Sequence, residues 1–307
     1  MEGVMRSPTA FLFLAGLVLT GCTPLQQLPA RHDTLNLAGA APDVVIIAMS
    51  GRCTQPCRAP RDNYDYLTSR GTLDALADVI TEAGFTVQVT GYADHAAETF
   101  QPLKVVQPQR GYKALVNDFA SMKSKWLSSA RPPRVVLLGH SHGAVWLHHL
   151  VRNNRDVAFA LQVDLDSSCA SWVLDHGAGL RVAQADLPGQ FPGISACDVI
   201  SVGNPPHWER NKDIVWPNVA QNFEVQSKRL PARTSPSGGL WVNYTFDTVP
   251  NTRVDGSGSG IDRFISTRED HSAVAYPNSD AMKWVLHRAR DLARVWKSED
   301  ALRNGGN

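Results

Sequence analysis

One stretch, residues 135–150, limits what this chain can fold into more than any other. It consists of an apolar run, a Gly-His-Ser-His-Gly turn at 139–143, and a second apolar segment whose large residues recur at helical spacing. Glycine has no Cβ, so Gly139 and Gly143 let a strand turn sharply into a helix without collisions. The turn is therefore predicted to hold the Ser141 hydroxyl at an exposed apex between a strand and a helix.

This strand, Gly-x-Ser-x-Gly turn and helix resemble the nucleophile elbow of α/β-hydrolases of the esterase and lipase kind. The resemblance implies an α/β fold with a mostly parallel central sheet and helices on both faces. It also implies that Ser141 attacks a carboxylic ester and forms an acyl-enzyme. A serine hydroxyl is a weak nucleophile alone, so this chemistry needs a base and a carboxylate that orients the base.

Two backbone amides are candidates for an oxyanion hole. Because Ser141 comes just before a helix, the first free amides of that helix point at an oxyanion formed beside it, and the His142 amide is the nearest. The family places a second donor on the loop after an early strand. Here that strand is the apolar run 44–49, and the amide of Arg52 is the candidate, followed by that of Gly51. An ordinary tight turn is the alternative for this loop.

His271 is the predicted base. It lies late in the chain in a polar loop, Asp270-His271-Ser272-Ala273, just before a final amphipathic helix. Families that resemble this chain place the catalytic histidine in such a loop. His176 and His207 are weaker alternatives, and His287 falls inside the predicted helix.

Two aspartates compete for the role of the acid. Asp166 closes the strand that follows the elbow helix, so it is expected at the carboxyl end of the strand beside Ser141. This placement resembles that of pancreatic-type lipases. Asp247 resembles the commoner placement, after a later strand at 240–246, but residues 222–226 suit that strand equally well and no aspartate follows them. Asp166 is preferred, and the alternative for either residue is a turn or cap aspartate.

Four histidines near the elbow raise the question of a metal site. No carboxylate accompanies them at ligand spacing, so the sequence predicts no metal and no cofactor. Two of them belong to the elbow, and the other two are expected on the surface of the following helix. The four are His140, His142, His148 and His149.

The first 22 residues have the pattern of an export signal. Arg6 precedes an apolar run at 10–19 that is too short for a membrane span. The run ends in Leu-Thr-Gly-Cys22, which resembles the lipobox of bacterial lipoproteins and implies that Cys22 is lipidated, with chains that anchor the protein in a membrane. No aspartate follows Cys22, which by resemblance favours the outer membrane. A plain signal peptide is the alternative.

The predicted domain plan follows from this leader. Residues 1–22 are a lipoprotein signal peptide, 23–42 a flexible tether, and 43–300 one α/β-hydrolase domain in the bacterial cell envelope, periplasmic or surface-exposed. Export also predicts disulfides, because the remaining cysteines form an even set in an oxidising compartment. Three pairings are open, and Cys53 with Cys57 and Cys169 with Cys197 is the simplest. An isolated C-x3-C lacks the second close pair of a zinc site.

Composition narrows the partners. The formal net charge of the 307 residues is +1, so no long-range field favours nucleic acid. The expected substrate is a small-molecule or lipid ester. An acyltransferase that uses the same residues, and a lipid-anchored binding protein without turnover, are the alternative functions.

Overall fold

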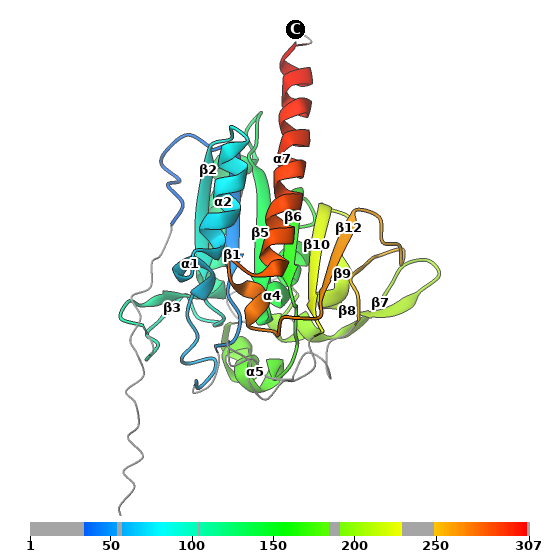
Figure 1. The fold of residues 1–307 in the computed structure, drawn as a ribbon. Helices are drawn as coiled ribbons and strands as arrows, with labels where there is room; N and C mark the ends of the chain where they lie inside the picture. The colour runs from blue at the N-terminus through cyan, green and yellow to red at the C-terminus, as the bar shows by residue number, and fades with distance from the viewer. Residues whose placement is uncertain (1–33, 54–56, 104, 184–190, 229–248, 306–307) are drawn as a thin grey trace, which may run out of the picture.

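The computed structural model describes residues 34–53, 57–103, 105–183, 191–228 and 249–305. Its core is a single sheet with helices packed on both sides (Figure 1). The strands of this sheet are β1 Val44–Met49, β2 Val87–Tyr92, β5 Arg134–His140, β6 Phe159–Leu165, β10 Val219–Ser227 and β12 Ile261–Ser266. The α-helices are α1 Tyr66–Ser69, α2 Thr72–Glu82, α3 Tyr112–Met122, α4 His142–Asn153, α5 Trp172–Ala183 and α7 Asp280–Gly305.

Shorter elements join these. They are β3 Thr99–Phe100, β4 Gln109–Arg110, the π-helical η1 Lys123–Leu127, the 3-10 turns η3 Gly193–Cys197, η4 Asn211–Asp213 and η5 Ala273–Ala275, the hairpin of β7 Val199–Val202 with β8 His207–Arg210, and the pair of β9 Ile214–Val215 with β11 Thr252–Arg253.

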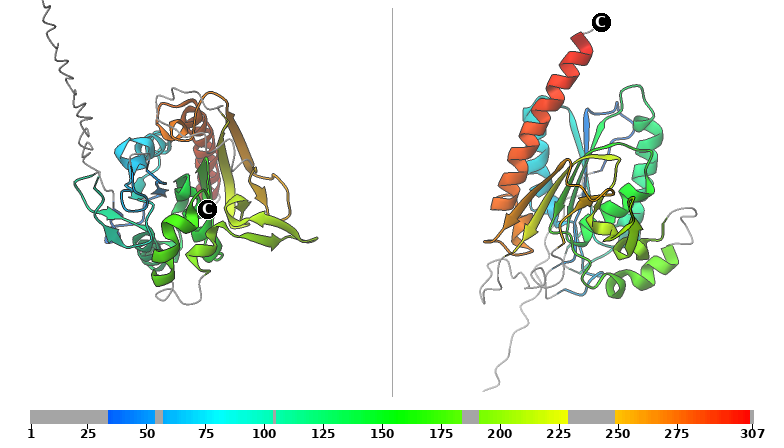
Figure 2. Two further views of the ribbon diagram at one scale, coloured as in Figure 1. Left: turned by 90° about the horizontal axis from the view of Figure 1, so that it is seen from below. Right: turned by 90° about the vertical axis from the view of Figure 1, so that its right-hand side faces the viewer.

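The sheet is parallel throughout, in the order β12-β10-β6-β5-β1-β2. Alternate residues of β1 enter two separate cores, because successive side chains of a strand point to opposite faces. Ile46 packs with residues of α2 and α7, whereas Ile47 packs with residues of α3 and α4. Figure 2 shows these helix pairs on opposite faces of the sheet. The predicted fold class, a mostly parallel sheet covered on both faces, is confirmed.

Most predicted elements form close to their expected bounds, with local shifts. The apolar run 44–49 is β1, and the helix predicted after the Gly-His-Ser-His-Gly turn is α4, which ends at Asn153. Thr72 is the first residue of α2, and Gly71, with φ +79°, is its cap. The Thr72 hydroxyl donates to the carbonyl of Ala275 and so joins the start of α2 to η5.

The expectation that His148 and His149 lie on a helix surface is wrong. Both are fully buried, because the segment from η3 to β9 packs over the outer face of α4. His148 lies between the Asp164 carboxylate, 3.0 Å from Nε2, and the carbonyl of Ile214, 3.0 Å from Nδ1. Burial and then the nearby Arg152 guanidinium lower the pKa of His149 to about 4.

Among the described residues there are two disulfides, Cys53–Cys57 and Cys169–Cys197, in the pairing preferred from the sequence. Cys22, the leader and most of the tether lie outside the described residues. Among the helices that are described, none is both long and apolar enough to cross a membrane.

Candidate active site

Ser141 stands alone between β5 and α4 in a backbone conformation that side chains rarely adopt, with φ +58° and ψ −127°. The neighbouring glycines permit it. A Cβ on Gly143 would lie 1.9 Å from the carbonyl oxygen of Met49, and a Cβ on Gly139 would lie 2.4 Å from Cα of Ala144. Both contacts are with backbone, so neither position accepts a larger residue without moving a strand or the helix.

The structure brings three of the predicted residues into one hydrogen-bonded line. His271 Nε2 lies 2.8 Å from Ser141 Oγ, and His271 Nδ1 lies 2.7 Å from Asp166 Oδ2. Each residue follows the carboxyl end of a different strand, β5 for Ser141, β6 for Asp166 and β12 for His271. Ligands bind at this edge of open parallel sheets because loops from several strands converge there.

The fold is that of the α/β-hydrolases. The parallel sheet, the strained serine between β5 and α4, and the serine, aspartate, histidine order along the chain together define it.

Comparison with protein-family models finds no match, and neither does comparison with curated proteins. Solved structures do resemble the chain. One, from work on the metagenome-derived lipolytic enzymes LipS and LipT, is 15% identical, with 89% of this chain and 98% of that chain covered and a TM-score of 0.41. Est1E from Butyrivibrio proteoclasticus with bound ferulic acid is 10% identical, with 80% of this chain and 86% of that chain covered and a TM-score of 0.37. An esterase domain from Rhodothermus marinus is 13% identical, with 81% of this chain and 85% of that chain covered and a TM-score of 0.36. At these scores the likenesses carry no argument about activity, so the chemistry of the site is derived from its own side chains.

Asp166 is held by more than His271. Its backbone is left-handed, with φ +53°, a region that aspartate tolerates better than most residues. The amide of Ser227 donates to Oδ1 at 2.8 Å, and the Ser227 hydroxyl donates to Oδ2 at 2.7 Å. Ser227 ends β10, the strand beside β6, so its position was not visible without the strand order. Asp247, the alternative acid, and its strand at 240–246 lie outside the described residues.

The loop after β1 lies against the elbow. A Cβ on Gly51 would lie 2.4 Å from the carbonyl oxygen of His140 and 2.5 Å from Cβ of Ser141. The Gly51 amide donates to the Tyr66 hydroxyl at 2.8 Å and is therefore engaged. Within the described part of the chain, the amides of Arg52 and His142 have no acceptor, which leaves both available to an oxyanion. The Arg52 side chain pairs with Asp175 of α5, with Nε 2.7 Å from Oδ2.

A second histidine supports His271 from behind. The Tyr66 hydroxyl hydrogen-bonds to Nδ1 of His140, and Nε2 of His140 lies 2.6 Å from the carbonyl oxygen of His271. A carbonyl oxygen only accepts, so Nε2 of His140 carries a proton. Burial lowers the pKa of His140 well below its usual value, so the ring is neutral and Nδ1 accepts from the Tyr66 hydroxyl. A chain of hydrogen bonds thus runs from the Gly51 amide through Tyr66 and His140 to the backbone of His271.

A buried group outside this line has the composition of a metal site. Asp94, His142 and His176 lie near enough together to hold a metal ion. No spacing along the chain indicates this group, because Asp94 is 48 residues from His142. His176, the alternative base, belongs to this group: its Nε2 lies 2.8 Å from Asp94 Oδ1.

Proposed function

We propose that this protein is a serine hydrolase of the α/β-hydrolase kind that cleaves a carboxylic ester through an acyl-enzyme on Ser141. The observation that carries the proposal is the line of two short hydrogen bonds from Ser141 Oγ to His271 and from His271 to Asp166, at 2.8 and 2.7 Å. A serine, a base and a carboxylate in this contact are the components of nucleophilic acyl transfer.

In the first half-reaction, Ser141 Oγ attacks the ester carbonyl while His271 Nε2 takes the serine proton. The carbonyl oxygen becomes an oxyanion that faces the amides of His142 and Arg52. When the tetrahedral intermediate collapses, the bond to the alcohol oxygen breaks and His271 returns the proton to that oxygen. The alcohol leaves, and the acyl group remains on Ser141.

In the second half-reaction, His271 takes a proton from water as the water oxygen attacks the acyl carbonyl. The second tetrahedral intermediate releases Ser141, which recovers its proton from His271, and the carboxylic acid departs. Asp166 keeps the Nδ1 proton of His271 throughout and stabilises the imidazolium that forms in each half. The two bonds from Ser227 hold the carboxylate for this role.

Labelling of Ser141 tests the proposal. A fluorophosphonate probe should label the wild-type chain and fail to label Ser141→Ala, while Ser124→Ala, an exposed serine on η1, should label as wild type does. Folded protein that shows no Ser141-dependent labelling would point to the non-catalytic binding protein. Products formed with added alcohol then separate hydrolysis from acyl transfer, because only a transferase gives mainly the new ester.

We also propose that Cys22 is lipidated and that the catalytic domain is tethered to a bacterial membrane, with the outer membrane favoured. The support is the Leu-Thr-Gly-Cys motif together with the two disulfides of the domain, which are usual in exported proteins. A lipid ester or a small-molecule ester is the substrate class that fits such a location.

A further inference from the structure

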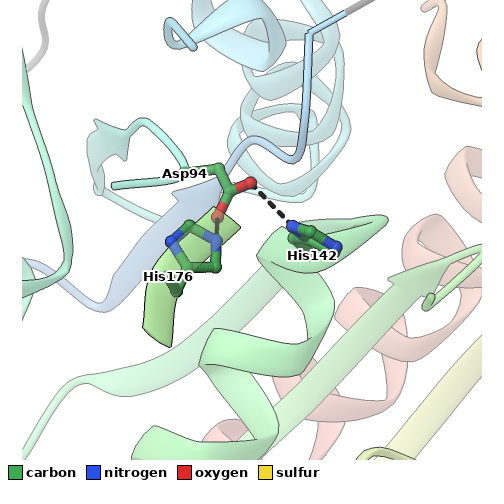
Figure 3. A group of neighbouring side chains, drawn as sticks. All are labelled: Asp94, His142 and His176. Carbon is green, nitrogen blue, oxygen red and sulfur yellow. Dashed lines mark hydrogen bonds and ion pairs between the residues drawn. The ribbon is translucent and has the colours of Figure 1, made fainter. Parts of the chain in front are cut away.

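Behind the elbow, two imidazoles share one buried carboxylate (Figure 3). Asp94 follows β2, His142 is the first residue of α4, and His176 lies on α5. Asp94 Oδ2 is 2.9 Å from His142 Nδ1, and Asp94 Oδ1 is 2.8 Å from His176 Nε2. All three side chains are at most 1% exposed.

Three side chains donate hydrogen bonds to the carboxylate of Asp94. Besides the His142 ring, the indole nitrogen of Trp146 donates to Oδ1 at 2.7 Å, and the amide of Asn63 donates to Oδ2 at 3.1 Å. A carboxylate offers about four lone-pair sites, and His142, Trp146 and Asn63 occupy three of them, while His176 Nε2 approaches Oδ1 without hydrogen-bond geometry. These contacts are those of a hydrogen-bonded anion. A metal ion at Asp94 would have to displace these N–H donors from the carboxylate.

The partners of His142 determine how many protons it carries. Nδ1 faces the Asp94 carboxylate, and Nε2 lies 2.7 Å from the carbonyl oxygen of Ala170. Both partners only accept, so both nitrogens must donate, and a histidine that donates twice is an imidazolium. His176 differs, because among the described residues neither of its ring nitrogens has a partner in hydrogen-bond geometry, although Nε2 lies 2.8 Å from Asp94 Oδ1.

The charges around His142 also favour the doubly protonated ring. Burial alone would lower the pKa of His142, but the Asp94 carboxylate, the hydrogen bonds to Asp94 and Ala170, and the charge of Asp175 raise it above its usual value overall. The pKa of Asp94 is lowered, since the two imidazoles outweigh its burial. The other titratable or charged groups nearby are His176 of α5, His95, which follows Asp94, and Arg52, which pairs with Asp175.

We propose that Asp94 and His142 form a second carboxylate–imidazolium pair that positions the oxyanion hole. The side chain of His142 is fixed at both nitrogens, to the loop after β2 and to the loop after Asp166, so the backbone amide of the same residue is held facing the Ser141 oxyanion. His142 thus acts through its main chain, and Asp94 is a positioning residue. The inference rests on the proposed hydrolase function.

Three substitutions separate the parts of this pair. His142→Asn keeps a donor near the Nδ1 position for Asp94, His142→Gln keeps one near the Nε2 position for Ala170, and His142→Leu keeps neither. With a chromogenic ester, kcat should fall least for the first two and by about 10- to 100-fold for His142→Leu, with KM within about twofold, because an oxyanion donor acts mainly in the transition state. His287→Asn, which removes an exposed histidine paired with Asp291, should leave kcat unchanged.

A pH profile distinguishes this role from mere support of the fold. In the wild type, kcat should decline as the pH rises through the raised pKa of His142, because deprotonation removes one of its two hydrogen bonds. In His142→Asn this alkaline decline should be absent. An unchanged alkaline limb in a folded His142→Asn protein, or an unchanged kcat in His142→Leu, would overturn the proposal.

Spectra and metal analysis test the pair without any turnover. In the full chain labelled with 15N-histidine, the ring signals that His142→Asn removes should be those of a doubly protonated imidazole at neutral pH. A neutral tautomer, or one equivalent of a bound transition metal in the purified protein, would overturn it. Failure of the hydrolase proposal would show separately, as loss of fluorophosphonate labelling at Ser141 with the imidazolium signals intact.

Discussion

At the scale of single residues, Asp166 is the residue on which the orientation of His271 depends. Its Oδ2 accepts from both His271 and the Ser227 hydroxyl, and its Oδ1 accepts from the Ser227 amide. The carboxylate therefore cannot rotate without breaking bonds to β10. A change at Asp166 should alter the tautomer of His271 more than the shape of the site.

Asp166→Asn should keep the fold and lower kcat by about 10⁴, because the amide favours the wrong histidine tautomer. Steady-state kinetics with a chromogenic ester, together with a thermal melt, measures both parts. Asp247→Asn is the matched comparison and should lower kcat far less. Loss of turnover in Asp247→Asn with an active Asp166→Asn would reverse the assignment of the acid.

Tyr66→Phe should lower both kcat and stability. It removes the hydroxyl that donates to His140 and accepts from the Gly51 amide, leaving two buried polar groups unpaired at about 1–3 kcal/mol each. Urea unfolding and ester kinetics would check this. Tyr64→Phe changes a neighbouring ring that meets Tyr66 edge to face, so it serves as the control. Equal effects at both positions would contradict a specific role for the Tyr66 hydroxyl.

The elbow motif predicted Ser141, and the family resemblance predicted His271 and Asp166, whereas no sequence pattern indicated the residues that hold them in place. Ser141 and the His142 amide follow from five consecutive residues. Tyr66, Asp94 and Ser227 do not, because they meet His140, His142 and Asp166 across 74, 48 and 61 residues. Their positions depend on strand order, which no local pattern encodes.

At the scale of elements, the loop after β6 links the acid to the elbow. It carries Asp166, the Ala170 carbonyl that accepts from His142, and Cys169, which is bonded to Cys197 at the end of η3. The burial of His148 and His149 shows why the exposure of a helix face is harder to predict than the helix itself. A helix pattern gives the spacing of apolar residues, but the segment that later covers the polar side of α4 has no mark in the helix itself.

Loss of the Cys169–Cys197 bond should lower the free energy of unfolding by about 2 to 4 kcal/mol, because this bond closes a longer loop than Cys53–Cys57 does. The separations are 28 and 4 residues. Urea unfolding of Cys169→Ser with Cys197→Ser, compared with the double serine variant at 53 and 57, measures the difference. An equal or larger loss at 53 and 57 would contradict the loop-length argument.

At the scale of the whole molecule, buried histidines make stability depend on pH. The pKa of His149 is lowered to about 4 by burial, so between about pH 6.5 and 4 the unfolded chain binds a proton that the folded chain does not. Stability should therefore fall as the pH falls through that range, by on the order of 3 kcal/mol for this group. His148 contributes in the opposite direction: its pKa is raised, so its stabilisation is complete below pH 6.5 and is lost as the pH rises through that pKa.

Urea unfolding at pH 5 and pH 7 measures the first effect, and His149→Gln should reduce the difference between the two values. A difference unchanged by His149→Gln would assign the acid sensitivity to other groups, with His140 as the next to test, since its pKa is also lowered.

The membrane tether gives a prediction for the intact protein in cells. Cys22→Ala should release the protein from the membrane fraction and leave esterase activity intact, because the site residues Ser141, Asp166 and His271 all belong to the domain that follows the predicted tether at 23–42. Fractionation followed by an ester assay of each fraction checks both statements. Continued pelleting of the variant with membranes would refute lipidation at Cys22.

The long last helix has a practical consequence. The C-terminal end of α7 lies at the opposite end of the sheet from α5, whose His176 ring lies 5.4 Å from that of the elbow residue His142 (Figure 1). A bead, a purification tag or a fusion partner joined after α7 would therefore stand away from the mouth of the site. Immobilised in this way, the protein would present the end that carries Ser141 to a bulk solution or to an emulsion droplet, which is the orientation that an assay of the proposed hydrolase on a solid support requires.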